Sequence, residues 1–190
     1  MRVKDEIKKQ AIIRATIDLV NEIGFSASSV SKIAKRADVS PATLYIYYAN
    51  KEDLLVSTYT QIKACLGSAV MADFDASKPV RDSLMRAGEN LYRYISENRG
   101  LFYFTEQFAN SPYSNLVDQK KLEATFQPLF DLLQFGIDRK IIKDAPYEIL
   151  LAHLYNPVYD LVNPRLNPDF KPSPEDIKLS LTMAWDAIKL

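Results

Sequence analysis

Apolar residues recur every three or four positions along most of the chain, whereas the alternation typical of strands is weak throughout. The first stretch predicts a helix over residues 4–23 that ends at Gly24, with Phe25 filling the core of a three-helix unit. Its apolar stripe consists of Ile7, Ala11, Ala15, Leu19 and Ile23. Further helices are predicted over residues 51–71, 79–97, 101–109, 118–137, 145–162 and 175–190. The chain is therefore expected to be all-α, with about nine helices.

Residues 26–55 are organised differently, in short pieces. An apolar helical pattern from Val30 to Ala37 is interrupted over residues 38–40. Ser40 is a favourable N-cap and Pro41 suits the first turn of a helix, so a second helix of barely two turns is predicted to follow. Such a short helix is not stable alone and must be held by packing. Two short helices joined by a tight turn are typical of the helix-turn-helix motif, whose second helix lies in the major groove of DNA.

The composition narrows the classes of function. The chain has 190 residues, of which 47% are hydrophobic, so a packed core is expected. The single cysteine, Cys65, excludes an intrachain disulfide and fits a reducing, cytoplasmic setting. No apolar run approaches the ~20 residues that span a membrane. The sequence contains no glycine-rich phosphate loop, metal-ligand cluster or Ser-His-Asp spacing, so we expect no enzyme activity, no cofactor and no metal site.

The short-helix region resembles a known family. The motifs that carry the likeness are Ser28-Ser29-Val30, Ile33-Ala34, Ala37-Asp38-Val39-Ser40, Thr43-Leu44-Tyr45, Tyr47-Tyr48 and Lys51-Glu52-Asp53-Leu54-Leu55. Together they closely resemble the DNA-binding signature of the tetracycline-repressor (TetR) family, over about 50 residues. Asp38 stands where the family usually has Gly, and aspartate tolerates the left-handed backbone conformation better than most residues.

The resemblance implies both a domain plan and a function. A helix-turn-helix DNA-binding domain is expected over residues 1–50 and an effector-binding and dimerisation domain over residues 51–190, with residues 51–71 as the connecting helix. The expected function is a homodimer that binds a palindromic operator in double-stranded DNA and acts as a repressor until a small-molecule effector releases it. The alternative is a DNA-binding regulator without a small-molecule pocket, either architectural or controlled by a protein partner.

In the family geometry the second short helix enters the major groove. The residues then expected to face DNA are Ser28, Ser29, Ser40, Pro41, Ala42, Thr43, Tyr45, Ile46, Tyr47 and Lys51. Apolar groups would read bases through contacts such as those with thymine methyls, whereas Ser28, Thr43, Tyr47 and Lys51 would contact phosphates. For Tyr45 a core position and a phosphate contact are both open. The net charge is zero, so positive charge must come from local groups at the rim, namely Lys4, Lys8, Lys32 and Arg36. Taken in isolation, Lys32, Lys35 and Arg36 are more typical of a solvated helix face.

Aromatic residues concentrate in the middle of the chain, where the resemblance implies an effector pocket. The candidate ligand-binding residues are Tyr92, Phe102, Glu106, Gln107, Asn110, Phe126, Phe130, His153 and Asn156. An aromatic pocket favours a flat, hydrophobic, cationic ligand with Glu106 as its counter-charge. The alternative for every one of these residues is a structural role, as core aromatics or as hydrogen-bonded polar groups.

A two-fold palindrome requires a two-fold protein. The expected dimer interface is a four-helix bundle formed by residues 145–163 and 175–190 of each subunit. The candidate interface residues are Leu154, Val158, Leu181, Ala184, Trp185 and Ile188. The last helix is apolar on more than one side, which indicates more than one neighbour.

Overall fold

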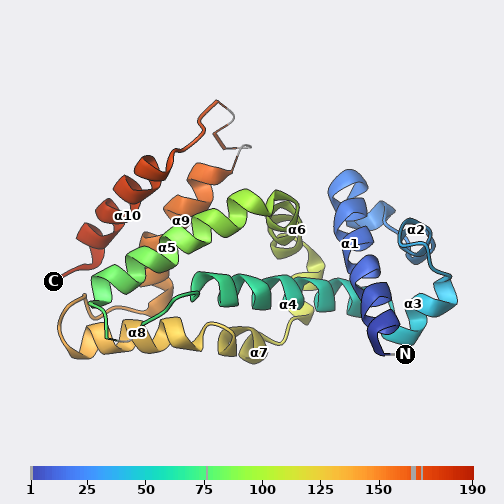
Figure 1. Ribbon diagram of the computed structural model, residues 1–190, viewed down its shortest axis with the longest axis horizontal. Coiled ribbons are helices and arrows are strands. Elements are labelled where there is room, and N and C mark those ends of the chain that lie inside the picture. The colour runs from blue at the N-terminus through green and yellow to red at the C-terminus, as the bar shows by residue number, and fades with distance from the viewer. Residues whose placement is uncertain (1, 76, 164–165, 168) are drawn as a thin grey trace. The chain divides into compact units, whose positions relative to one another are not determined.

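The structure, a computed structural model, describes residues 2–75, 77–163, 166, 167 and 169–190 (Figure 1). The chain is 77% helical, with ten α-helices, nine of them of seven or more residues, and no strand is found over the described ranges. These residues form two compact units. The first contains the chain up to Ala64 together with Asn98–Leu122, and the second contains Cys65–Glu97 and Glu123–Leu190. The all-α prediction is confirmed.

The first unit is built around its N-terminal helix. Its elements are α1 (Arg2–Ala27), α2 (Val30–Arg36), α3 (Pro41–Tyr47), the first part of α4 (Lys51–Val70), α6 (Arg99–Ala109) and the 3-10 helix η1 (Pro112–Leu116). One face of α1 packs with α2 and α3 in a first core cluster that consists of Ile12, Ala15, Leu19, Ile33, Ala34, Leu44, Tyr48 and Leu54. A second face packs with α4, α6 and the segment after η1 in a cluster of Ile13, Ile17, Val20, Leu55, Ile62, Phe104, Phe108 and Val117.

The packing of α1 corrects two predictions. Ile7 and Ile23, at the ends of the predicted apolar stripe, are 63% and 42% exposed, whereas Ala15 and Leu19 in its middle are buried in the first core cluster, so only the middle of the stripe is buried. Phe25 does not fill the three-helix core. It lies instead in the second cluster, with ring centroids 5.7 Å from Phe104, 6.1 Å from Phe108 and 5.5 Å from Tyr113. The reason is that Gly24 adopts φ 75° and ψ 170°, which turns the chain before Phe25.

The second unit packs long helices side by side. Its elements are the last part of α4, α5 (Val80–Glu97), α8 (Gln127–Asp138), α9 (Tyr147–Val162) and α10 (Pro174–Ile188). The short α7 (Gln119–Ala124) lies across the division between the units. Helix α10 contacts both α9 and α5, as Figure 1 shows. Its start is fixed by a capping box, in which Ser173 Oγ accepts from the backbone N–H of Asp176 and the Asp176 carboxylate accepts from Ser173 N–H.

Prolines decide several boundaries. The predicted helix over residues 118–137 is divided, because Pro128 lies in the first turn of α8 and a new helix starts there. The helix predicted from Ala145 starts at Tyr147, after Pro146. Pro157 lies inside α9 without ending it. No described helix combines the length and apolar character that crossing a membrane requires.

The contact between α5 and α10 depends on a missing side chain. A Cβ added to Gly88 would lie 2.4 Å from Leu181 Cδ2, so the two helices approach more closely than any larger residue allows. We expect Gly88→Ala to lower the free energy of unfolding by about 1–3 kcal/mol through overpacking, measured by urea denaturation followed by circular dichroism. Gly100→Ala is the matched control, because its Cβ would meet nothing closer than Asn21 Nδ2 at 3.8 Å. A Gly88→Ala protein as stable as the control would contradict the close packing.

Candidate nucleic-acid interface

Helix α3 presents a small apolar face to solvent. Ser40 caps its N-terminus by accepting from the Thr43 N–H at 3.0 Å, and its hydroxyl also lies 2.9 Å from Thr43 Oγ1. Leu44 points inward and is fully buried, which anchors the helix in the first core cluster. Tyr45 and Ile46 point outward, with 54% and 78% of their surfaces exposed. The open choice for Tyr45 is therefore decided in favour of an exposed position, beside the exposed Pro41 and Ala42.

The turn between α2 and α3 takes the shape that the helix-turn-helix motif requires. Ser29 caps α2 by accepting from the Lys32 N–H at 3.3 Å. Asp38 has φ 54°, in the left-handed region, as predicted for a residue in the place of glycine. The following residue, Val39, donates its N–H to the Ala34 carbonyl and packs partly against the core, so the turn is held at both ends.

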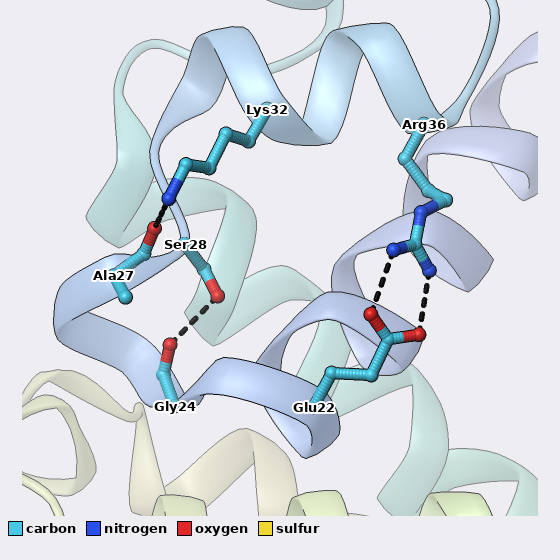
Figure 2. Close-up of polar contacts among 6 residues, drawn as sticks. All are labelled: Glu22, Gly24, Ala27, Ser28, Lys32 and Arg36. Carbon is cyan, nitrogen blue, oxygen red and sulfur yellow. Dashed lines mark hydrogen bonds and ion pairs between the residues drawn. The ribbon is translucent and has the colours of Figure 1, made fainter.

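Several polar groups predicted to contact DNA are already bonded within the protein (Figure 2). Ser28 is fully buried, and its Oγ donates to the Gly24 carbonyl at 2.7 Å. Its side chain therefore closes the turn after α1 and is not available to a phosphate, which corrects the prediction for this residue. Lys32 donates through Nζ to the Ala27 carbonyl at 3.0 Å.

Arg36 forms a two-bond ion pair with Glu22 of α1 (Figure 2). Both of its terminal nitrogens donate to the carboxylate at 2.7 Å. This hydrogen bonding to Arg36 holds the pKa of the Glu22 carboxyl below its ordinary value. The side chains are 40% and 52% exposed, so the pair contributes little net stability, but it reduces the positive charge that α2 offers to a ligand. The side chain of Lys4, also predicted at the rim, lies outside the described residues.

The end of α3 and the start of α4 are tied to α1. Tyr47 is partly buried against the first core cluster, and its hydroxyl donates to Asp5 Oδ1 at 3.1 Å. Partial burial, together with this carboxylate, raises the pKa of Tyr47. Lys51, partly buried, donates through Nζ to the Phe25 carbonyl at 2.6 Å. The same carbonyl also accepts from the Ser28 N–H at 3.3 Å, so the Lys51 ammonium has a structural partner at the end of α1.

Tyr48 confirms the interpretation of this residue as part of the core. It is 3% exposed and belongs to the first cluster, and burial raises the pKa of its phenol to about 12. Its hydroxyl is buried without a hydrogen-bond partner among the described atoms. A buried hydroxyl without a hydrogen bond lowers the free energy of unfolding, because it has lost its contacts with water.

Most of the predicted DNA-facing residues are accessible at least in part on the surface of the protein. Ser29, Ser40, Pro41, Ala42, Tyr45 and Ile46 are exposed, Thr43, Tyr47 and Lys51 are half-buried, and Ser28 is excluded. The sequence interpretation missed the two acidic partners of this surface, Asp5 and Glu22. No local signal identifies them, because the contacts join residues 42 and 14 positions apart.

Comparison with known proteins matches both parts of the chain to models of one protein family. Residues 12–58 match the family model described as "Bacterial regulatory proteins, tetR family", and residues 59–190 match "Tetracyclin repressor-like, C-terminal domain". The chain belongs to the TetR family. It is therefore a transcriptional regulator with a helix-turn-helix DNA-binding domain, and it belongs among regulators rather than enzymes.

Individual relatives agree with the family. The crystal structure of a TetR family transcription regulator from Marinobacter aquaeolei VT8 is 36% identical, covers 100% of this chain and 99% of its own, and has a TM-score of 0.91. An uncharacterised HTH-type transcriptional regulator of Haemophilus influenzae is 25% identical over 99% of this chain and 98% of its own. The Bacillus subtilis "Fatty acid metabolism regulator protein" is 44% identical, but over only 28% of either chain.

The predicted effector residues of this TetR-family protein are divided between the two units. Phe102, Glu106 and Gln107 on α6 and Asn110 at its C-terminal cap lie in the first unit, and Tyr92, Phe126, Phe130, His153 and Asn156 lie in the second. Several of their polar groups have structural partners. Gln107 donates to Asn21 Oδ1 at 3.0 Å, Asn110 donates to the Glu106 carbonyl at 2.9 Å, and Tyr92 donates to the Pro172 carbonyl at 3.0 Å. Their role in binding an effector stays a prediction.

Two surface clefts are found among the described residues of the second unit. One, of about 600 Å³, lies between the end of α4 and the start of α5 and is lined by residues such as Phe74, Lys78 and Arg86. The other, of about 580 Å³, lies along α9 and α10. Of the predicted effector residues, His153 lines the second cleft. Its side chain is exposed, and its Nδ1–H donates to the Ile149 carbonyl, 2.9 Å away.

Most of the residues predicted at the dimer interface are buried inside the subunit, which leaves them unavailable on its surface. Leu154, Val158, Leu181, Ala184 and Ile188 are at most 6% exposed and pack inside the subunit, and Trp185 is half-buried. The apolar residues that these helices expose are different ones, including Ile149 at 50%, Leu179 at 61% and Met183 at 65%. Met183 and Leu179 line the cleft together with Pro157 and Leu161. The correction follows from the contact of α10 with α5, which takes up the face that had been assigned to a partner.

The turn of the helix-turn-helix gives a test of its backbone geometry. We expect Asp38→Gly to raise the free energy of unfolding by up to about 1 kcal/mol, because glycine adopts positive φ without steric cost. Gly24→Ala is the opposite control. Its new Cβ would meet nothing within 4 Å, yet at φ 75° and ψ 170° alanine should cost about 1–3 kcal/mol. Chemical denaturation of both variants measures the two effects, and a destabilised Asp38→Gly protein would show that the aspartate side chain has a role of its own.

Proposed function

We propose that this protein is a homodimeric repressor that places one α3 helix from each subunit in successive major grooves of a palindromic operator. The observation that carries the proposal is the outward face of α3, where Tyr45 and Ile46 are 54% and 78% exposed on a helix that Leu44 anchors in the core. Two large apolar side chains exposed to water on so short a helix cost free energy. Exposed apolar groups of this kind mark interaction sites, and DNA would cover both side chains in the bound state.

The chemistry of this face favours recognition by shape and methyl contacts. Ala42, Thr43 and Ile46 offer methyl groups that suit thymine C5-methyls, and the Tyr45 hydroxyl is exposed for a phosphate or a base edge. The basic groups nearby are partly engaged, since Arg36 pairs with Glu22 and Lys51 with the Phe25 carbonyl. A single subunit therefore offers a limited contact, and binding two half-sites at once multiplies the affinity of one.

The exposed apolar side of α9 and α10 supports the dimer. It is continuous along the cleft lined by Ala152, Pro157, Leu161, Leu179 and Met183, and apolar patches of this kind mark protein interfaces. A face of two antiparallel helices that meets its own copy around a two-fold axis forms a four-helix bundle. This supports the arrangement expected from the family, through a different set of residues.

Control by a small effector requires a path to the DNA-binding helices, and α6 offers one. In the first unit, Asn21 of α1 donates to the Gly100 carbonyl at 2.8 Å and accepts from Gln107 Nε2 at 3.0 Å. Phe25 packs against the α6 rings as well. Because α1 also carries the helix-turn-helix on its other face, a ligand that displaces α6 would change the position of α3. Release by such a ligand is the regulatory part of the proposal.

The DNA-binding proposal predicts a footprint. The wild-type protein should protect a palindromic segment in the DNA adjoining its own gene, and Ile46→Ala should weaken that binding by about tenfold or more through lost apolar contact. Ile23→Ala is the matched control, since Ile23 is an exposed isoleucine of the same unit, on α1. DNase footprinting and fluorescence anisotropy measure both. The absence of any protected palindrome, or equal losses in the two variants, would count against the proposal.

If the exposed face of α9 and α10 forms the dimer, a substitution that disrupts this face should yield a monomer. Leu179→Glu should weaken self-association by at least about tenfold, because it would bury an unpaired carboxylate in the interface. Leu116→Glu is the control, because Leu116 is 56% exposed, close to the 61% of Leu179, but lies on η1 of the other unit. Sedimentation equilibrium distinguishes the two. A Leu179→Glu protein that remained as dimeric as the control would place the interface elsewhere.

A further inference from the structure

The hydroxyl of Tyr47 is held by a carboxylate at the edge of the DNA-binding surface. Tyr47 is the last residue of α3, and its ring packs against the first core cluster, so the position of the hydroxyl is fixed by the core. The hydroxyl donates to Oδ1 of Asp5, an exposed residue in the first turn of α1, at 3.1 Å. The two residues are 42 positions apart, so the contact is made by the fold and not by local sequence.

This bond limits what Tyr47 can do. A tyrosine hydroxyl has a single proton to donate, and a carboxylate and a phosphate oxygen are both acceptors for it. While Tyr47 donates to Asp5, it cannot donate to DNA. A phosphate that takes over this proton must also approach the Asp5 carboxylate, which carries charge of the same sign.

Asp5 differs in charge from the other protein groups that accept hydrogen bonds from residues of the DNA-binding surface. Lys51 and Lys32 donate to the carbonyl oxygens of Phe25 and Ala27, which are neutral and do not repel a phosphate. Glu22 is ionised, but its charge is matched by the two-bond pair with Arg36. At Tyr47 the partner is an anion and the donor is neutral, so the pair itself is negative.

We propose that Asp5 competes with DNA phosphates for the Tyr47 hydroxyl and thereby lowers the affinity of this protein for DNA of any sequence. The inference rests on the proposed placement of α3 in the major groove. Phosphate contacts carry no direct sequence information, so the competition weakens specific and non-specific binding together and leaves the preference among sequences to Ala42, Tyr45 and Ile46. Such a contact limits the time spent on non-specific DNA without altering the base-reading face.

The test is a double-mutant cycle on Asp5 and Tyr47. Binding would be measured by fluorescence anisotropy, for a labelled duplex carrying the DNA adjoining the gene and for a mixed-sequence duplex of equal length. We expect Asp5→Asn to bind both duplexes about threefold to tenfold more tightly than the wild type. In the Tyr47→Phe background, which lacks the hydroxyl, the same substitution should keep only the smaller gain that comes from removing a negative charge.

Glu6→Gln is the matched control, because it removes the same charge one residue away, where Glu6 accepts from Gln10. The gain of Asp5→Asn should exceed that of Glu6→Gln in the wild-type background and equal it in the Tyr47→Phe background. Asp5→Ala provides a second variant that removes the acceptor entirely, and thermal unfolding checks the fold of each protein. Weaker binding by Asp5→Asn, or a gain no larger than that of Glu6→Gln, would overturn the inference. A wild-type protein that bound neither duplex would instead refute the proposed function.

Discussion

The helix-turn-helix depends on the burial of α1 on two faces. Ile12, Ala15 and Leu19 hold α2 and α3 through the first core cluster, while Ile13 and Ile17 belong to the second, which includes α4 and α6. Neither α2 nor α3 is long enough to be a stable helix alone, so both exist because α1 supplies the surface against which they bury Ile33 and Leu44. The same helix therefore fixes the DNA-reading element and connects it to the rest of its unit.

Several polar groups around α3 have partners within the protein. The carbonyls of Gly24, Ala27 and Phe25, at and just after the kink in α1, accept from the side chains of Ser28, Lys32 and Lys51. The carbonyls of Phe25 and Ala27 accept from the backbone N–H groups of Ser28 and Ser29 as well. In the proposed mode of DNA binding, Lys32 and Lys51 would therefore exchange an internal partner for a phosphate.

The helices and their ends could be predicted from the sequence to a large extent. The N-cap at Ser40, the capping box at Ser173 and the positive φ of Asp38 all follow from local chemistry and are found in the structure. Which face of each helix is buried could not be predicted equally well. Helix α10 carries Leu181 and Ile188 on one side and Leu179 and Met183 on another, and both sides are apolar. Hydrophobicity alone does not say which side is filled by α5 and which is left for another molecule.

The sequence by itself therefore determined the all-α class, the position of the helix-turn-helix and the family to which its motif belongs, because these depend on residues within a few turns of one another. Only the tertiary structure decided which apolar face of α1, α9 and α10 is buried, and that Tyr47 is bonded to Asp5. The physical reason is the same in each case. Burial and hydrogen bonding depend on which group lies opposite a residue in the folded chain, and for these residues that group comes from a distant part of the sequence.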